Sequence, residues 1–200
     1  MSRQAFEFSK PGLDEVIADD LARATATAQD AEIIAGTAAS GRTRGLLNWT
    51  GILSVTGTVT NQSTFLTGLW QAYSALAGTS GFGAFTVDEY VTILHPRRAA
   101  WLLAGVSGTL PASQPLVPGR LVVSAGVPTN LGAGTNEDVA IIVERSQVVV
   151  LERGLRIRVF EQVGSGTMTV RVQANTSTAL LVKNATAVAK VTGLTAPTGF

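Results

Sequence analysis

The sequence predicts an α+β fold, and two patterns in it carry that prediction. Apolar residues recur at helical spacing between residues 13 and 35. From Asp138 onward, apolar and polar residues mostly alternate, which is the period of a half-buried strand. A chain of 200 residues can bury a sizeable core without disulfides, and this one contains no cysteine.

The first predicted element is a long helix over residues 10–35. Ser9 can cap its start, and Pro11 suits its first turn, where a missing N–H costs little. Gly36 is expected to end it. Its apolar stripe consists of Leu13, Val16, Ile17, Leu21, Ala24, Ala28, Ala31 and Ala35. A helix of roughly six or seven turns is long for a globular protein.

Shorter elements follow along the chain. A second helix is predicted over 63–77, and a short third helix over 97–104, after the step from His95 to Pro96. The predicted strands cover 90–94, 121–123, 139–144, 148–152, 155–163 and 167–172. Residues 179–192 fit a strand, a short helical turn, or both.

The composition indicates either a very compact fold or a surface that is partly covered by another chain. Charged residues make up 14% of the sequence, against about 25% in an average soluble domain. The formal net charge of +1 argues against a dedicated nucleic-acid binder. No signal peptide is visible in residues 1–10, and no apolar run is long enough to span a membrane.

Residues that could carry chemistry are few. His95 is the only histidine, and its place between an apolar strand and Pro96 predicts a structural role at a turn. The densest acidic group comprises Asp14, Glu15, Asp19 and Asp20. This group is better interpreted as a solvated helix face than as a metal site. The glycine-rich stretches 41–45 and 132–135 lack the spacing of a phosphate-binding loop. We therefore predict no catalytic residue, no cofactor and no metal site.

Several short stretches carry a resemblance to a known family. They are SRQAFEFS at 2–9, PGLDEVI at 11–17, DLA at 20–22, QDAEIIAGT at 29–37, RGLL at 44–47, LHPRRAAW at 94–101, and 122–128 followed by the acidic pair at 137–138. In their order and spacing these stretches resemble major capsid proteins of tailed bacteriophages, the Hong Kong 97 type. The resemblance extends over about residues 2–193.

The resemblance implies a Hong Kong 97-type capsid fold. It would combine a long spine helix, a peripheral-domain sheet, and an axial domain of mixed sheet plus short helices. Residues 1–65 and 161–200 would form the peripheral domain and 66–160 the axial domain. A subunit contact is expected at Leu131, Gly132, Ala133, Gly134, Thr135 and Asn136. Family members carry an N-terminal arm and an extended loop before the spine helix, and this sequence is expected to lack both.

The resemblance also implies a structural role rather than an enzymatic one. The protein would be the major capsid protein of a tailed double-stranded DNA phage or prophage. Copies of it would form pentamers and hexamers of an icosahedral head, assembled in the bacterial cytoplasm and found in the virion. Portal, scaffold and decoration proteins are candidate partners. The double-stranded DNA would be enclosed without sequence-specific binding, and no membrane would be involved.

Three alternatives stay open from the sequence. The first is an encapsulin-like bacterial compartment shell of the same fold. The second, from another class, is a β-rich surface binding module, which the threonine and glycine content and four Asn-x-Ser/Thr triplets would suit. The third is an enzyme with a carboxylate site, against which the scarcity of histidine and charged residues counts.

Overall fold

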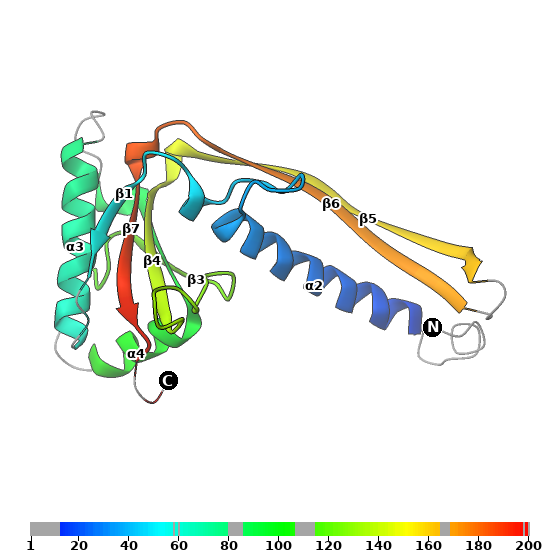
Figure 1. Ribbon diagram of the computed structural model, residues 1–200, viewed down its shortest axis with the longest axis horizontal. Coiled ribbons are helices and arrows are strands. Elements are labelled where there is room, and N and C mark those ends of the chain that lie inside the picture. The colour runs from blue at the N-terminus through cyan, green and yellow to red at the C-terminus, as the bar shows by residue number, and fades with distance from the viewer. Residues whose placement is uncertain are drawn as a thin grey trace.

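The computed structural model describes residues 13–57, 59, 61–79, 86–106, 115–164, 169–197 and 199. The chain forms two parts, which Figure 1 shows side by side. We call the part built on a five-stranded sheet the sheet body, and the extended part built on a long helix and a two-stranded hairpin the arm. The arm projects away from the sheet body (Figure 1).

The sheet body is built on a mixed sheet in the order β1-β7-β4-β2-β3. Its strands are β1 Leu53–Thr56, β2 Tyr90–Leu94, β3 Arg120–Val123, β4 Glu137–Glu144 and β7 Val188–Thr195. The central strand β4 runs antiparallel to both neighbours, whereas β1 pairs parallel with β7 and β2 parallel with β3. Because β4 has its side chains buried on both faces from Asp138 to Glu144, it is apolar over most of its length rather than alternating.

Two helices complete the sheet body, α3 Gln62–Thr79 and α4 Pro96–Val106. The apolar side of α3 packs on β1 and β7, and Gly68 faces Val191 of β7. The ring of Phe65 meets Trp101 of α4 edge to face, with centroids 5.9 Å apart. These contacts hold α3 and α4 against one hydrophobic core, which also contains Leu69, Leu76, Leu94, Leu102, Ile142, Ala189 and Leu194.

The long helix of the arm is α2 Leu13–Ala35, which confirms the predicted spine helix, while Ser9 and Pro11 lie outside the described residues. The amide of Gly36 donates the closing hydrogen bond to the Glu32 carbonyl, 2.9 Å away. The side-chain amide of Asn48 donates to the carbonyls of Ala35 and Gly36. The helix therefore ends where the sequence predicts, and its last carbonyls are satisfied by the segment that leads into the sheet body.

The second layer of the arm is a hairpin of two long antiparallel strands, β5 Val148–Gly164 and β6 Thr169–Val182. The sequence predicted two shorter strands, 148–152 and 155–163, in place of β5. The structure shows one strand because the register shifts between Arg153 and Arg156 without breaking the pairing. The helix α2 packs on β6 (Figure 1).

The two parts do not coincide with the predicted division into 1–65, 66–160 and 161–200. Strands β1 and β7 were grouped with the peripheral domain, but both lie in the five-stranded sheet of the sheet body. Most of β5, grouped with the axial domain, lies instead in the arm. The physical reason is long-range pairing, since β7 hydrogen-bonds to β1 and β4 rather than continuing the hairpin that precedes it.

Candidate subunit interfaces

The predicted contact loop precedes β4 at the edge of the sheet body. Its residues Leu131, Gly132, Ala133, Gly134, Thr135 and Asn136 are exposed, except Leu131, which is partly buried. Leu131 and Glu137 exchange both backbone hydrogen bonds, which closes the loop at its base. Gly132 and Thr135 adopt left-handed backbone conformations, with φ of 73° and 51°. The loop is a defined turn, and its part in a subunit contact stays a prediction.

A buried ion pair anchors the strand that follows this loop. Arg98 of α4 and Asp138 of β4 are each only 1% exposed, and their charged atoms lie 2.7 Å apart. Arg98 also donates to the carbonyls of Leu194 and Thr195 at the end of β7. Its guanidinium lies 5.2 Å from the centre of the Trp101 ring. One arginine therefore joins α4, β4 and β7 beneath the candidate contact loop.

His95 caps the helix that carries this arginine. The backbone amide of Arg97 donates to His95 Nδ1 at 3.2 Å, and the amide of Ala99 donates to the His95 carbonyl. Pro96 occupies the first helical position, where its fixed φ suits the helix. Burial lowers the pKa of His95, and the charge of Arg97 lowers it further, while Asp138 opposes both. The geometry places His95 at the strand-to-helix turn, where the sequence predicted a structural histidine.

The hairpin of the arm has two chemically different faces. On β6, half-buried residues alternate with exposed ones, and the half-buried side faces α2. On the opposite side, Arg153, Arg156 and Arg158 of β5 pair with Ser177, Asn175 and Gln173 of β6. Arg171 is next in the same alternation on β6. We call the surface formed by Arg153, Arg156, Arg158 and Arg171 the arginine face, because cross-strand partners project to one side.

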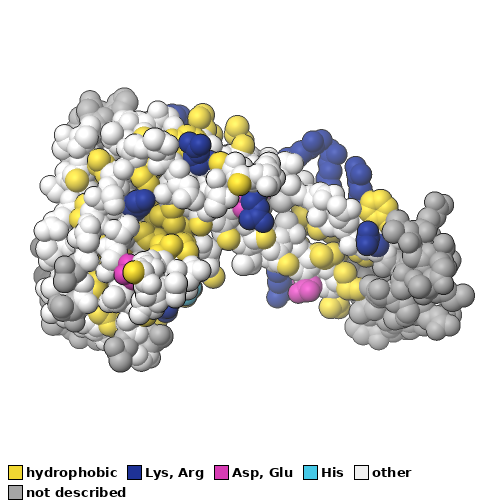
Figure 2. Space-filling view, viewed as in Figure 1, with side chains coloured by type: hydrophobic (Ala, Val, Ile, Leu, Met, Phe, Trp, Pro, Cys, Tyr) yellow, Lys and Arg dark blue, Asp and Glu magenta, His cyan; other side chains and the backbone are white. Residues whose placement is uncertain are grey.

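The arginine face has no neutralising acid in the described part of the chain. None of its four guanidinium groups forms an ion pair with a carboxylate whose position is described. All four arginines are exposed. Figure 2 shows basic side chains gathered along the hairpin side of the arm.

Apolar side chains are also exposed along β5. Leu151, Ile157 and Val159 are 59%, 42% and 49% exposed, although β-branched and leucine side chains in strands normally pack against a neighbour. The reason is geometric, because α2 packs on β6 and leaves much of β5 uncovered. Leu151 lies on the arginine side of the hairpin, and Ile157 and Val159 lie on the side that faces α2, so both sides of β5 expose apolar side chains. Exposed apolar side chains of this kind are typical of a surface that another chain covers.

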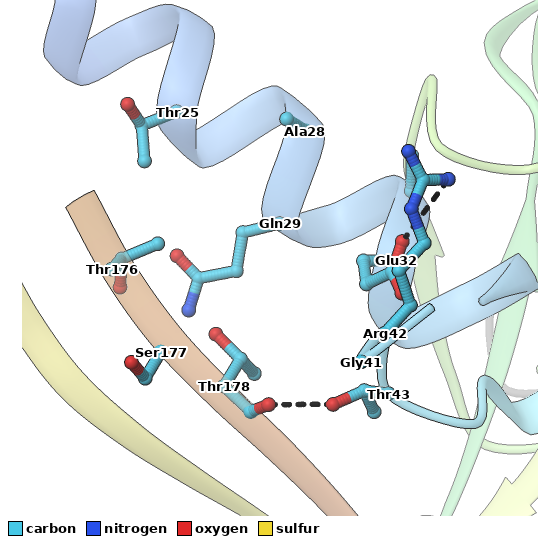
Figure 3. A pocket seen from close by; sticks show the side chains of 11 residues that line it. Thr25, Ala28, Gln29, Glu32, Gly41, Arg42, Thr43, Thr176, Ser177 and Thr178 are labelled. Carbon is cyan, nitrogen blue, oxygen red and sulfur yellow. Dashed lines mark hydrogen bonds and ion pairs between the residues drawn. The ribbon is translucent and has the colours of Figure 1, made fainter. Parts of the chain in front are cut away.

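A pocket lies between α2, residues 41–43 and the second half of β6 (Figure 3). It has a volume of about 570 Å³ and is lined mainly by small and hydroxyl-bearing side chains. In Figure 3, Gln29 of α2 extends towards Thr178 of β6, and Thr43 donates to the carbonyl of Thr178. Glu32 and Arg42 lie at the rim, 4.0 Å apart. The lining offers hydrogen bonds but no arrangement of nucleophile and base.

Two further findings concern the described residues alone. No group of three or more His, Cys, Asp or Glu side chains among them lies close enough to hold a metal ion. None of the helices in the same ranges is both long and apolar enough to cross a membrane.

The sequence pointed to one candidate surface and missed the other. The loop over 131–136 was identified from the resemblance alone. The arginine face was missed, although the alternation of Arg156 and Arg158 with Ile157 and Val159 was visible as a strand pattern. The strand pattern could not reveal that β5 pairs with β6. This pairing brings Arg171 to the same surface as the three arginines of β5, and the packing of α2 on β6 decides which side of the hairpin is covered.

Comparisons with known proteins find the same architecture in solved capsid structures. The capsid of an empty GTA particle matches with a TM-score of 0.67 and 15% identity, over 96% of this chain and 70% of that one. A structure of Gordonia phage Cozz matches with a TM-score of 0.69 and 16% sequence identity, over 96% of this chain and 67% of that one. An encapsulin complex from Synechococcus elongatus matches with a TM-score of 0.60 and 18% sequence identity, over 97% of this chain and 70% of that one. No family model and no curated protein matches the sequence.

The likeness includes both the sheet body and the arm, because it covers nearly the whole chain. The fold is therefore that of tailed-phage major capsid proteins, the Hong Kong 97 type, as the sequence resemblance implied. At identities of 13–18%, these likenesses establish the fold and leave the function to be argued from the surfaces.

Proposed function

We propose that this protein is a structural shell subunit of the capsid type. The observation that carries the proposal is the match of both the sheet body and the arm to solved capsid structures, over 96% of the chain. A shell subunit works through broad contacts repeated by symmetry, so it needs no deep site for a small molecule.

The arm supports this proposal on physical grounds. It consists of one helix on a two-stranded hairpin, and a two-stranded hairpin has little stability of its own in water. Along the arm, Leu151, Ile157 and Val159 stay largely exposed in the isolated chain. Neighbouring copies would remove these side chains from water and stabilise the arm by about 25 cal/mol for each Å² of apolar surface buried.

In its particular form, the proposal is the major capsid protein of a tailed phage or prophage. Pentamers and hexamers of the subunit would build an icosahedral head around double-stranded DNA, and the protein would be found in the virion. The exposed loop over 131–136 would contact neighbouring copies near the symmetry axis of each ring. Portal, scaffold or decoration proteins are the further candidate partners in this role.

Electron microscopy of the purified full-length protein tests the proposal. We expect rings or closed particles, with a sedimentation coefficient far above that of a monomer. A species that stays monomeric at high concentration and over a wide range of salt would contradict the proposal. Measurable turnover of a small substrate by that monomer would replace it with an enzymatic function.

An encapsulin-like compartment shell is the second candidate function. The likeness to the encapsulin from Synechococcus elongatus, over 97% of this chain, favours it nearly as well as the phage structures favour a head. The contents of the particles discriminate between the two. Nuclease-protected DNA, with terminase and portal genes nearby, would indicate a phage head. Protein cargo from an enzyme gene nearby would indicate a compartment.

A further inference from the structure

The outer sides of the two layers of the arm carry opposite charge. The helix α2 contains six acidic residues and one basic residue. The strands β5 and β6 contain four arginines and two glutamates. Since these two layers pack on each other through α2 and β6, their charged outer sides face in opposite directions. Figure 2 shows several basic side chains on the hairpin side of the arm, and one acidic side chain next to one basic side chain on the opposite side.

The acidic charge on α2 forms a stripe on the side away from the hairpin. Glu15, Asp19 and Asp30 are exposed, and their spacing places them on one helical face. The face turned towards β6 holds Leu21, Thr25 and Ala28 instead. We call Glu15, Asp19 and Asp30 the acidic stripe. Asp19 pairs with Arg23 on the same face, both side chains being more than half exposed.

From these positions we infer that the arginine face of one copy binds the acidic stripe of a second copy. This inference rests on the proposed function, and it names a contact through which shell subunits would join. The spacings are compatible, because Arg156 and Arg158 lie about 7 Å apart along the strand. Glu15 and Asp19 lie about 6 Å apart along the helix. Two guanidinium groups can therefore face two carboxylates at once, and such groups form strong paired hydrogen bonds.

Apolar residues beside the charges favour a protein partner over a polyanion. Leu151 lies on the same side of the hairpin as Arg153 and is 59% exposed. Val16 follows Glu15 on the outer side of α2 and is also 59% exposed. A contact between two copies can bury both side chains under a rim of ion pairs, which is the usual arrangement of protein interfaces. A phosphate backbone would use the arginines and leave Leu151 in water.

The inference also predicts the symmetry of the contact. The arginine face and the acidic stripe are different surfaces on opposite sides of the same arm, so the contact is heterologous. Heterologous contacts build closed rings or open filaments, rather than twofold dimers. That geometry agrees with a subunit that forms pentamers and hexamers. Because the charges are exposed, salt should weaken the contact.

Charge exchange in the full-length protein tests the inference. We would compare the wild type with Arg156→Glu/Arg158→Glu, with Glu15→Arg/Asp19→Arg, and with a chain that carries all four substitutions. Sedimentation velocity and electron microscopy at low and high salt measure association. Each pair alone should weaken association about tenfold or more, since like charges then oppose each other. The fourfold variant restores the attraction with reversed signs and should regain most of the association.

A matched control is the variant Arg120→Glu/Arg145→Glu. It makes the same change in net charge at two exposed arginines of the sheet body. This control should associate like the wild type, and circular dichroism should show that every variant is folded.

The other possible outcomes distinguish a failure of this inference from a failure of the proposed function. If the wild type assembles and the hairpin variant assembles equally well, the inference is overturned and the proposed function stands. A fourfold variant that fails to regain association also overturns the inference. Loss of retention on immobilised DNA with unchanged association would assign the arginine face to a polyanion instead. A wild type that never associates would contradict both the inference and the proposed function.

Discussion

The guanidinium of Arg98 lies 2.7 Å from the carboxylate of Asp138, and both side chains are buried in the sheet body. The pair joins α4 to the central strand β4, and Arg98 also binds two carbonyls at the end of β7. Arg97 reaches the same carboxylate from the protein surface. A buried charge that loses its partner is costly, whereas an apolar pair of similar volume can be tolerated.

Replacing Asp138 with Asn should therefore destabilise the fold strongly. We expect a loss of about 3–5 kcal/mol in the free energy of unfolding, because the charge of Arg98 stays buried. Chemical denaturation measures this value. The double variant Arg98→Met/Asp138→Leu should lose clearly less than the sum of its single variants. Additive losses would show that the two residues are not energetically coupled.

His95 should make stability depend on pH below neutrality. Its pKa is lowered in the folded protein from the ordinary value of 6.5, so the folded state binds the proton less readily than the unfolded chain. Its contribution to stability is complete above pH 6.5 and is lost as the pH falls from there through the lowered pKa. Thermal unfolding between pH 8 and pH 5 measures this loss.

The control for His95 is the variant His95→Asn. Asparagine is a good helix cap and does not titrate, so the variant should keep the cap on α4 at all pH values. Its stability curve should be flatter than that of the wild type between pH 8 and pH 5. Parallel curves for the two proteins would assign the pH dependence to other groups.

Gly45 should tolerate no side chain at the junction between arm and sheet body. Its amide donates to the carbonyl of Gly36 at 2.8 Å, and a methyl group on Gly45 would lie 2.7 Å from the amide nitrogen of Ala35. Gly45→Ala should therefore destabilise by about 1–3 kcal/mol through steric overlap. Gly78→Ala is the matched control, since Gly78 is exposed in α3 with open space around it. That control should stabilise by up to about 1 kcal/mol.

The variant Ile157→Thr/Val159→Thr should weaken assembly more than it weakens the fold. Both side chains are largely exposed in the isolated chain, and threonine keeps the preference for a strand. The free energy of unfolding should change by less than about 1 kcal/mol, whereas the yield of rings or particles should fall. Leu103→Gln replaces an equally exposed leucine on α4 and serves as the comparison. Unchanged assembly would place Ile157 and Val159 outside the subunit contacts.

Local chemistry explains which elements could be predicted. The periodicity that ends at Gly36 predicts α2, and the step from His95 to Pro96 predicts the start of α4, because these signals act within a few residues. The strand predictions were less complete, because the extent of a strand also depends on a partner strand that is distant in the sequence. The bulge between Arg153 and Arg156 interrupts the alternation in sequence, but pairing with β6 carries one strand through it.

By itself, the sequence determined the α+β class, the long helix and its end, most strand positions, and the low content of charged residues. Only the tertiary structure decided that β7 joins the sheet body, that Arg98 reaches Asp138, and that four arginines share one face of the hairpin. The physical reason is distance along the chain. Helices and caps depend on neighbours within one turn, whereas strand partners and buried ion pairs join residues tens of positions apart, which no local pattern specifies.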